Sequence, residues 1–233
     1  MRDMLRWTVP FILWNGLCLF LAGKLKRDAG VPTGYSRKIF HFLIFFSSCV
    51  IQWQWGLSRL CLFGVCTTAV LAWALIKGHG HLLYEALARE KDEPRRTLFI
   101  ISPYLATLTG GLLSNFLFGR AAMAGYLVAG MGDAVGEIVG TQLGRHRYRV
   151  FSPSGVQSWR SVEGSLGVGL VSTLALLLVW HWGWSVEYSP HNILLAGAVG
   201  VACAVMEGIS PHGWDNLTMQ LLPAACTVWL LGN

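Results

Sequence analysis

Two carboxylates, Asp133 and Glu137, lie four residues apart in a stretch that has no other ionised side chain, residues 121–144. This spacing places both of them on one face of a helix. An aspartate at the centre of a membrane helix costs ~2.5–3.5 kcal/mol on insertion scales, so two acids together favour a bound cation. Because carboxylate oxygens are the ligands that Mg²⁺ prefers, the pair predicts a metal site.

Glycines recur every fourth residue beside these acids, at Gly132, Gly136, Gly140 and Gly144. Such a stripe is a common device for packing one membrane helix against another. It also leaves a groove without side chains, where a nucleotide phosphate or a lipid chain can come close to the backbone. Both interpretations stay open, and under the second one Gly132, Gly136 and Gly140 contact the nucleotide.

A basic connection follows and returns to an apolar stretch through the residues RSVEGS, which begin at Arg160. The forked guanidinium of an arginine suits phosphate oxygens. Glu163 and Ser165 stand where a helix is expected to begin. There Glu163 either favours the positive end of the helix dipole, or lies beside unpaired N–H groups that receive phosphate. In the second case Glu163 is also a candidate metal ligand and catalytic carboxylate, and Ser165 a phosphate contact.

Two more polar groups lie at the ends of expected helices. Arg37, Lys38 and His41 begin one apolar stretch, either as phosphate-binding cations with a catalytic histidine or as anchors that reach to the membrane surface. Asp215 and Asn216 begin another apolar stretch near the C-terminus. We take Asp215 as a candidate base and Asn216 as a candidate nucleotide contact.

The composition shows what kind of element positions these groups. The chain has 233 residues, 54% of them hydrophobic and 13% charged, whereas soluble domains are about 25% charged. We therefore expect an all-α, polytopic membrane bundle of seven to eight transmembrane helices, which forms a single domain over residues 1–233. The expected spans are 7–25, 39–56, 58–77, 98–119, 121–144, 162–184, 191–209 and 216–231.

The basic residues predict the orientation of these spans. Most of the 18 Lys and Arg residues lie in the first, third and fifth connections, which the positive-inside rule places in the cytoplasm. The net charge of +6 is therefore a feature of membrane topology rather than of nucleic-acid binding. Every polar group described above then lies near the cytoplasmic end of its span. Acids that can hold Mg²⁺ near cations predict phosphoryl or nucleotidyl transfer at a lipid head group.

Four of these pieces, in this order, resemble the polyprenol kinase family, which includes phytol, farnesol and dolichol kinases. They are Arg37-Lys38 with His41, GDAVGEIVGTQLGRHRYRV from Gly132, RSVEGS from Arg160, and MEGISPHGWDNLT from Met206. The resemblance implies phosphorylation of a lipid alcohol, commonly with CTP and Mg²⁺. It also implies functional roles for the residues Arg37, Lys38, Asp133, Glu163, Asp215 and Asn216.

The chain departs from the family pattern in two places. Arg160 stands where the family often has lysine before the EGS element, and the stretch from Val150 to Trp159 is long. Two alternatives stay open. One is a cytidylyltransferase like the CDP-diacylglycerol synthases, which also have a glycine-rich GD helix followed by SP and EGS elements. The other is an ion-coupled transporter with buried acids.

The prediction from these observations is a CTP-dependent lipid-alcohol kinase that acts on an isoprenoid or related alcohol. Asp133, with Glu137 or Glu163, holds Mg²⁺, and Arg37, Lys38 and Arg160 balance the phosphate charge. His41 or Asp215 accepts the hydroxyl proton, with Asp215 preferred. The first span begins at Trp7, which leaves no room for a transit peptide. We therefore expect a bacterial inner membrane, with the endoplasmic reticulum as the alternative.

Overall fold

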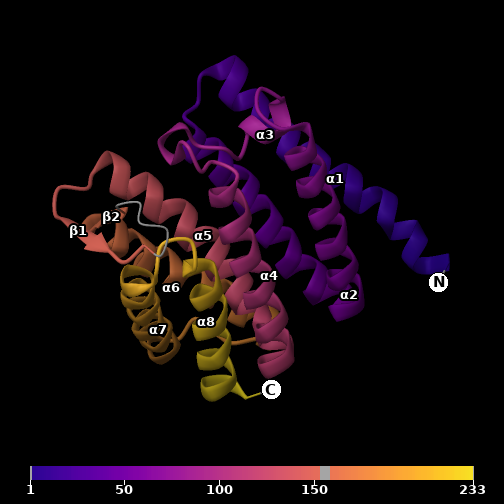
Figure 1. Ribbon diagram of the computed structural model, residues 1–233. Helices are drawn as coiled ribbons and strands as arrows, with labels where there is room; N and C mark the ends of the chain where they lie inside the picture. Colours follow the sequence, from indigo (N-terminus) through magenta and orange to yellow (C-terminus); the bar gives the residue numbers. More distant parts are fainter. Residues whose placement is uncertain (1, 153–157, 233) are drawn as a thin grey trace. The chain divides into compact units, whose positions relative to one another are not determined.

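The computed structural model describes residues 2–152 and 158–232, and it confirms the all-α fold class (Figure 1). A short β-hairpin, β1 and β2, interrupts the helices. The elements are α1 (Arg2–Ala29), α2 (Thr33–Lys77), α3 (Leu82–Glu85), η1 (Glu90–Asp92), α4 (Leu98–Phe118), η2 (Gly119–Ala121), α5 (Ala122–Gln142), β1 (Arg147–Val150), β2 (Ser158–Ser161), α6 (Val162–Trp184), α7 (Pro190–Ile209) and α8 (Asp215–Leu231).

The chain contacts divide the protein into two compact units, Met1–Ile101 and Ser102–Asn233. The single domain over residues 1–233 therefore stays a prediction. The first unit holds α1, α2, α3 and η1, and the second holds the helices from α5 onward together with the hairpin. The α4 helix begins at the end of the first unit and continues into the second.

Five helical segments are long and apolar enough to cross a membrane, by length and composition. They are Arg6–Ala29, Thr33–Lys77, Leu98–Gln142, Val162–Trp184 and Pro190–Ile209. The second and third of these each have 45 residues, which exceeds one crossing at 1.5 Å per residue. The count of seven to eight spans stays a prediction.

The long segments change direction where the sequence predicts a boundary between spans. Gly56 has a φ of +76° inside α2, and it lies at the predicted boundary between spans 39–56 and 58–77. Gly119 has a φ of +53° at the start of η2, where spans 98–119 and 121–144 meet. Glycine adopts these left-handed conformations without the steric cost that a Cβ adds. These two breaks show how α2 and the α4–α5 segment are interrupted.

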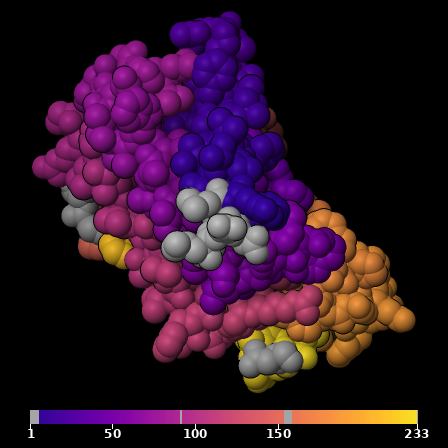
Figure 2. Space-filling view, turned by 90° about the vertical axis from the view of Figure 1, so that its right-hand side faces the viewer, coloured from indigo at the N-terminus to yellow at the C-terminus, as the bar shows by residue number. Residues whose placement is uncertain are grey.

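In the first unit, α1 lies against α2, as Figure 2 shows with the indigo surface beside the purple one. The rings of Trp7 and Phe11 are 5.4 Å apart, and Phe11 makes an edge contact with Phe63 of α2. Deeper in this contact, the Thr67 hydroxyl donates a 2.8 Å hydrogen bond to Oδ1 of the buried Asn15. Aromatic packing and one satisfied polar pair thus hold the two helices together.

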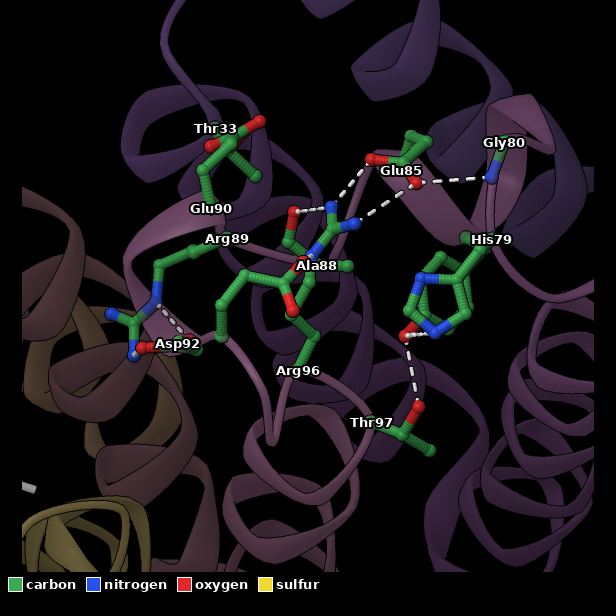
Figure 3. Close-up of polar contacts among 12 residues, drawn as sticks. Thr33, His79, Gly80, Glu85, Ala88, Arg89, Glu90, Asp92, Arg96 and Thr97 are labelled. Atoms are coloured by element: carbon green, nitrogen blue, oxygen red, sulfur yellow. Dashed lines mark hydrogen bonds and ion pairs between the residues drawn. The ribbon is translucent and has the colours of Figure 1, made fainter.

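An ionic network ties the connection between α2 and α4 to the rest of this unit (Figure 3). The guanidinium of Arg96 donates to both carboxylate oxygens of Glu85 and to the carbonyl oxygen of Ala88. The Nζ atom of Lys26 in α1 lies 3.3 Å from Oε2 of Glu85 and 2.7 Å from Oε1 of Glu90. Burial alone would raise the pKa of Glu85, but hydrogen bonds from Arg96, Gly80 and Lys26 outweigh it and lower that pKa.

In the second unit, small residues let the helices approach closely. The α5 helix packs on α6 and α8, and α6 packs on α7. At Gly125 of α5, an added Cβ would collide with the backbone of Gln220 in α8. The Gln220 side chain is fully buried and donates to the carbonyl oxygens of Thr107 and Asn216 at 3.1 and 2.7 Å. The tight α5–α8 contact therefore depends on glycine.

Replacing Gly125 by alanine tests this contact. The new methyl group meets backbone that cannot move aside, and overpacking of this kind costs typically 1–3 kcal/mol. We expect Gly125→Ala to lower the midpoint of thermal unfolding of the protein in detergent micelles. Gly197→Ala is the matched control, because the added Cβ meets nothing within 4 Å there. Equal midpoints for the two variants would contradict the described contact.

The ionic network predicts faster hydrogen exchange in Glu85→Gln, because Arg96 and Lys26 lose a charged acceptor. We expect the increase at residues 82–93, measured by mass spectrometry. Glu93→Gln is the matched control, since Glu93 is mostly exposed and lies 3.6 Å from Arg96. An equal increase in both variants would contradict the network.

Acidification should loosen the same connection. The hydrogen bond from Lys26 is the largest cause that lowers the pKa of Glu90, to about 2. A lowered pKa means that the stabilisation is complete above the ordinary value of 4.5 and is lost as the pH falls toward 2. We therefore expect protection of residues 82–93 from exchange to fall within this range, with the rates corrected for intrinsic exchange at each pH. Constant protection down to pH 2 would contradict the assignment.

Candidate active site

The hairpin brings several polar side chains to the start of α6. Its strands are antiparallel, and Tyr148 pairs with Arg160 while Arg147 pairs with Ser161. Side chains of directly paired residues lie on the same face of a two-stranded sheet. The β2 strand runs straight into α6, and the Ser161 hydroxyl caps this helix by accepting from the N–H of Gly164 at 3.1 Å. Figure 1 shows the hairpin at one end of the α5–α8 helices.

Arg160 lies between two carboxylates from different helices. Its Nε is 2.8 Å from Oε1 of Glu207 near the end of α7, and one terminal nitrogen is 2.9 Å from Oδ2 of Asp215 at the start of α8. The other terminal nitrogen donates to the carbonyl oxygen of Ser210 at 3.3 Å. The Arg160, Glu207 and Asp215 side chains are 12%, 13% and 17% exposed. One guanidinium thus holds β2, α7 and α8 together.

This arrangement bears on the roles predicted for Arg160 and Asp215. Two acids against one base leave the group with a formal charge of −1, so it can hold a cation or accept a proton. The Arg160 guanidinium already contacts two protein carboxylates, so it could bind a phosphate only while it also contacts Glu207 and Asp215. Its role in phosphate binding stays a prediction. Asp215 has an oriented carboxylate, since its Oδ1 also accepts from the N–H of Asn216 at 3.1 Å.

Glu163 faces the chain that leads into the hairpin. Its Oε1 lies 2.7 Å from Nδ1 of His146, and its carboxylate accepts from the backbone N–H groups of Arg145 and His146 at 3.1 and 3.3 Å. These contacts fasten the end of α5 to the start of α6. They explain the position of Glu163 without a ligand, and its predicted roles in metal binding and catalysis stay predictions.

Ser165 lies one turn into α6 and has a partner from the hairpin. Its hydroxyl is 2.7 Å from the hydroxyl of Tyr148, and either oxygen can donate. Ser165 is therefore paired with a neutral group in this structure. Tyr148 is also the strand partner of Arg160, so this hydroxyl pair and the Arg160 group share one hairpin.

Asp133 and Glu137 are half-buried, one turn apart on α5, and each has interactions with other groups. In the described ranges, 2–152 and 158–232, no three His, Cys, Asp or Glu side chains are placed to hold one metal ion. Asp133, Glu137 and Glu163 therefore do not form a ready three-ligand site. Mg²⁺ commonly takes one or two carboxylates and completes its shell with substrate phosphates and water. The Asp133–Glu137 pair fits that demand, and the metal site stays a prediction.

The glycine stripe packs against α6. An added Cβ at Gly136 would collide with Val168, and at Gly140 it would lie 3.1 Å from the Ser161 hydroxyl oxygen. Gly132 similarly faces Val168 and Ser172 of α6 and Met219 of α8. The helix-packing interpretation thus accounts for this face of α5. The stripe is not an open path for a lipid chain, as one interpretation of the sequence held, and contact of these glycines with a nucleotide stays a prediction.

The remaining candidates lie on two other helices. Asn216 is buried at the start of α8 and donates to the Thr107 hydroxyl of α4 at 2.9 Å, a structural contact that leaves its nucleotide role untested. Arg37, Lys38 and His41 lie in the first turns of α2. Arg37 donates to the carbonyl oxygen of Phe99, and the His41 ring lies 4.5 Å from that of Phe45. Lys38 is only 4% exposed, which is unusual for a surface anchor.

Three residues outside the predicted site belong to these polar groups: Glu207, His146 and Tyr148. The signal for Glu207 was its place near the end of an apolar stretch, close to Asp215 along the chain. The signal for Tyr148 was the alternation in RYRV and SWRS, which is typical of paired strands. No pattern in the sequence indicates the partner of His146. The long stretch after Val150 includes residues 153–157, which lie outside the described residues.

Comparison with known proteins identifies the family. No family model matches the chain. The chain is 31% identical over 208 residues to the phytol kinase of Synechocystis sp., and the match covers 88% of this chain and 83% of that protein. The chain belongs to the polyprenol kinase family. A match over 88% of the chain includes residues of both units, so the chain shares more with its relative than four short motifs.

A substitution at Arg160 tests the ion pairs that it makes. Arg160→Gln leaves Glu207 and Asp215 without their shared guanidinium. We expect the free energy of unfolding to fall by roughly 1–3 kcal/mol, less than the ~3–5 kcal/mol for fully buried pairs, because these side chains keep some exposure. Arg149→Gln, at an exposed residue of the same hairpin, should change little. Thermal unfolding in detergent measures both.

A second variant separates charge from packing. Arg160→Gln combined with Asp215→Asn removes the repulsion between the two acids, so it should regain part of the lost stability. The effect of Asp215→Asn alone on the wild type is measured for comparison. If Asp215→Asn lowers the free energy of unfolding of Arg160→Gln as much as that of the wild type, the described ion pairs do not hold the helix ends together.

Proposed function

We propose that this protein is a membrane kinase that transfers the γ-phosphate of CTP to an isoprenoid alcohol of the phytol type. The observation that carries the proposal is the Arg160 group. In a member of a lipid kinase family, it places two oriented carboxylates at the junction of β2, α7 and α8. The similarity to a protein named phytol kinase supports the acceptor class, and the family resemblance supports CTP as donor.

The transfer requires a base and an in-line attack. The alcohol oxygen forms a bond to the γ-phosphorus, the bond between this phosphorus and the bridging oxygen breaks, and CDP leaves. The hydroxyl proton passes to a carboxylate. Asp215 suits this step because Arg160 and the N–H of Asn216 fix its orientation, while the group as a whole keeps one negative charge. His41 is the other candidate base.

Phosphoryl transfer also needs neutralisation of the phosphate charge. Asp133 and Glu137 are the residues that would hold Mg²⁺, which supplies positive charge to the phosphate oxygens when it is bound. Arg37 and Lys38 of the first unit stay sequence-based candidates for neutralising the phosphate charge. Two exposed arginines, Arg145 just before the hairpin and Arg147 at the start of β1, offer further forked donors for the nucleotide. In this proposal the reaction takes place at the cytoplasmic face, where the basic connections lie.

The experiment follows two labels on CTP. Purified protein in phospholipid nanodiscs receives phytol, Mg²⁺ and CTP labelled either at the γ-phosphate or in the cytidine. We expect the γ-label, and not the cytidine label, to appear in the lipid fraction. Transfer of the cytidine label would instead show a cytidylyltransferase. Absence of both labels, with phytol, farnesol and dolichol each tested, would overturn the proposal.

A substitution tests the proposed metal ligand. Asp133→Asn keeps the shape of the side chain but removes its charge, so we expect γ-label transfer to fall at least about 100-fold, as for other lost electrostatic groups in transition states. The variant should insert and unfold like the wild type. Glu187→Gln, at an exposed residue outside the helices, is the matched control and should keep full activity. A fully active Asp133→Asn variant would remove Asp133 from the metal site.

A further inference from the structure

A long apolar groove runs between α6 and α7 in the second unit. Its volume is about 1070 Å³, slightly above the usual range of ligand pockets. It extends along α6 from Val162 to Thr173 and along α7 from Ile209 to Ile193, with residues 148–151 of the hairpin at one end. At 1.5 Å per helical residue, this is a path of about 16 Å or more.

The groove exists because small residues lie between large ones. Gly169 of α6 packs against Ala204 and Gly200 of α7, and an added Cβ at Gly200 would collide with Thr173, so the two helices approach closely. Gly197, by contrast, has nothing within 4 Å of its Cβ position. The walls are long side chains that stand out from the helices. They are Leu166, Leu170, Ile193, Leu194, Val201 and Val205, all of which are exposed.

One end of the groove carries a pair of neutral hydroxyl groups, and the exposed Arg149 of the hairpin also lines the groove there. Tyr148 and Ser165 both line it, and their hydroxyl groups lie 2.7 Å apart. They sit over Gly208, where an added Cβ would lie 2.9 Å from the Tyr148 hydroxyl oxygen. Glu207 is the next residue to Gly208, and Arg160 is the strand partner of Tyr148. The neutral hydroxyl pair therefore connects the apolar groove to the Arg160 group.

We infer that the groove between α6 and α7 binds the isoprenoid chain of the acceptor alcohol, with the alcohol hydroxyl beside Tyr148 and Ser165. This inference rests on the proposed function. The hydroxyl of an alcohol can both donate to and accept from the Tyr148–Ser165 pair. The large polar head group of a phospholipid would instead have to break the hydrogen bond between these two residues. The hydroxyl is then held at the end of the groove that leads to Arg160 and Asp215. The chain follows the apolar walls toward Gly197.

Filling the groove at Gly197 tests this inference. The Cβ of Gly197→Phe meets nothing within 4 Å, and the residue lines the groove, so we expect the ring to enter the groove and the helix to fold normally. We expect the KM for phytol to rise roughly tenfold or more, because the ring displaces buried methylene groups of the chain. The KM for CTP should stay the same, and the KM for geraniol, whose chain is shorter, should change much less. Gly64→Phe, at a glycine of α2 that also has nothing within 4 Å, is the matched control.

A binding measurement separates this inference from the proposed function. A phytol analogue with a photoreactive diazirine at its chain end is irradiated with wild-type protein in nanodiscs, without nucleotide. We expect labelled peptides from α6 and α7, less labelling when unlabelled phytol competes, and little labelling in Gly197→Phe.

The outcomes distinguish the two claims. Competed labelling of α6 and α7 in a protein without kinase activity would support the groove and overturn the proposed function. Labelling that phytol does not reduce, or that added phosphatidylglycerol reduces equally, would show that bilayer lipids fill the groove and would overturn the inference. The same conclusion follows if an active enzyme has an unchanged KM for phytol in Gly197→Phe.

Discussion

The second unit depends on one guanidinium shared by two acids. Arg160 contacts Glu207 and Asp215, and these contacts fix where β2 ends, where α7 ends and where α8 begins. Charged groups with little water around them need partners, since an uncompensated charge is far more costly there than at a wet surface. Lysine could not replace this arginine freely, because a single ammonium cannot present separate N–H groups to two carboxylates and a carbonyl in one plane. The departure from the lysine common in the family therefore has a structural consequence here.

Small residues perform two opposite tasks in the same helices. Along α5 they remove side chains so that α6 and α8 come close, as at Gly136 against Val168 and Gly125 against Gln220. Gly169 and Gly200 likewise let α6 and α7 approach closely. Gly197 instead has open space beyond its Cβ position, which forms part of the groove. Periodicity alone does not distinguish these cases. The difference is whether a neighbouring helix or open space lies beyond the missing side chain.

The sequence predicts the helices well and the polar contacts poorly, for physical reasons. Apolar stretches and glycine breaks are local signals, so the turns at Gly56 and Gly119 fall where the span boundaries were expected. The partners of Glu163 and Arg160 come from other segments, and a single sequence carries no record of such distances. Glu137 or Glu163 was predicted to help Asp133 hold Mg²⁺. The Glu163 carboxylate faces His146 and the backbone before the hairpin, contacts that no local pattern indicated, and its metal role stays a prediction. The hairpin was missed because two strands of four residues are short beside the apolar helices around them.

The hairpin is what couples the two halves of the proposed chemistry. A lipid kinase must hold an apolar chain and a highly charged phosphate within reach of one another, although each environment disfavours the other group. Tyr148 and Arg160 are direct strand partners, so one side chain faces the groove while its neighbour holds the acids. A neutral hydroxyl pair between them lets the environment change from apolar to charged over one strand spacing, about 5 Å. A substrate whose only polar group is a terminal hydroxyl matches that gradient, because its chain and its reactive oxygen then each lie in the surroundings that stabilise them.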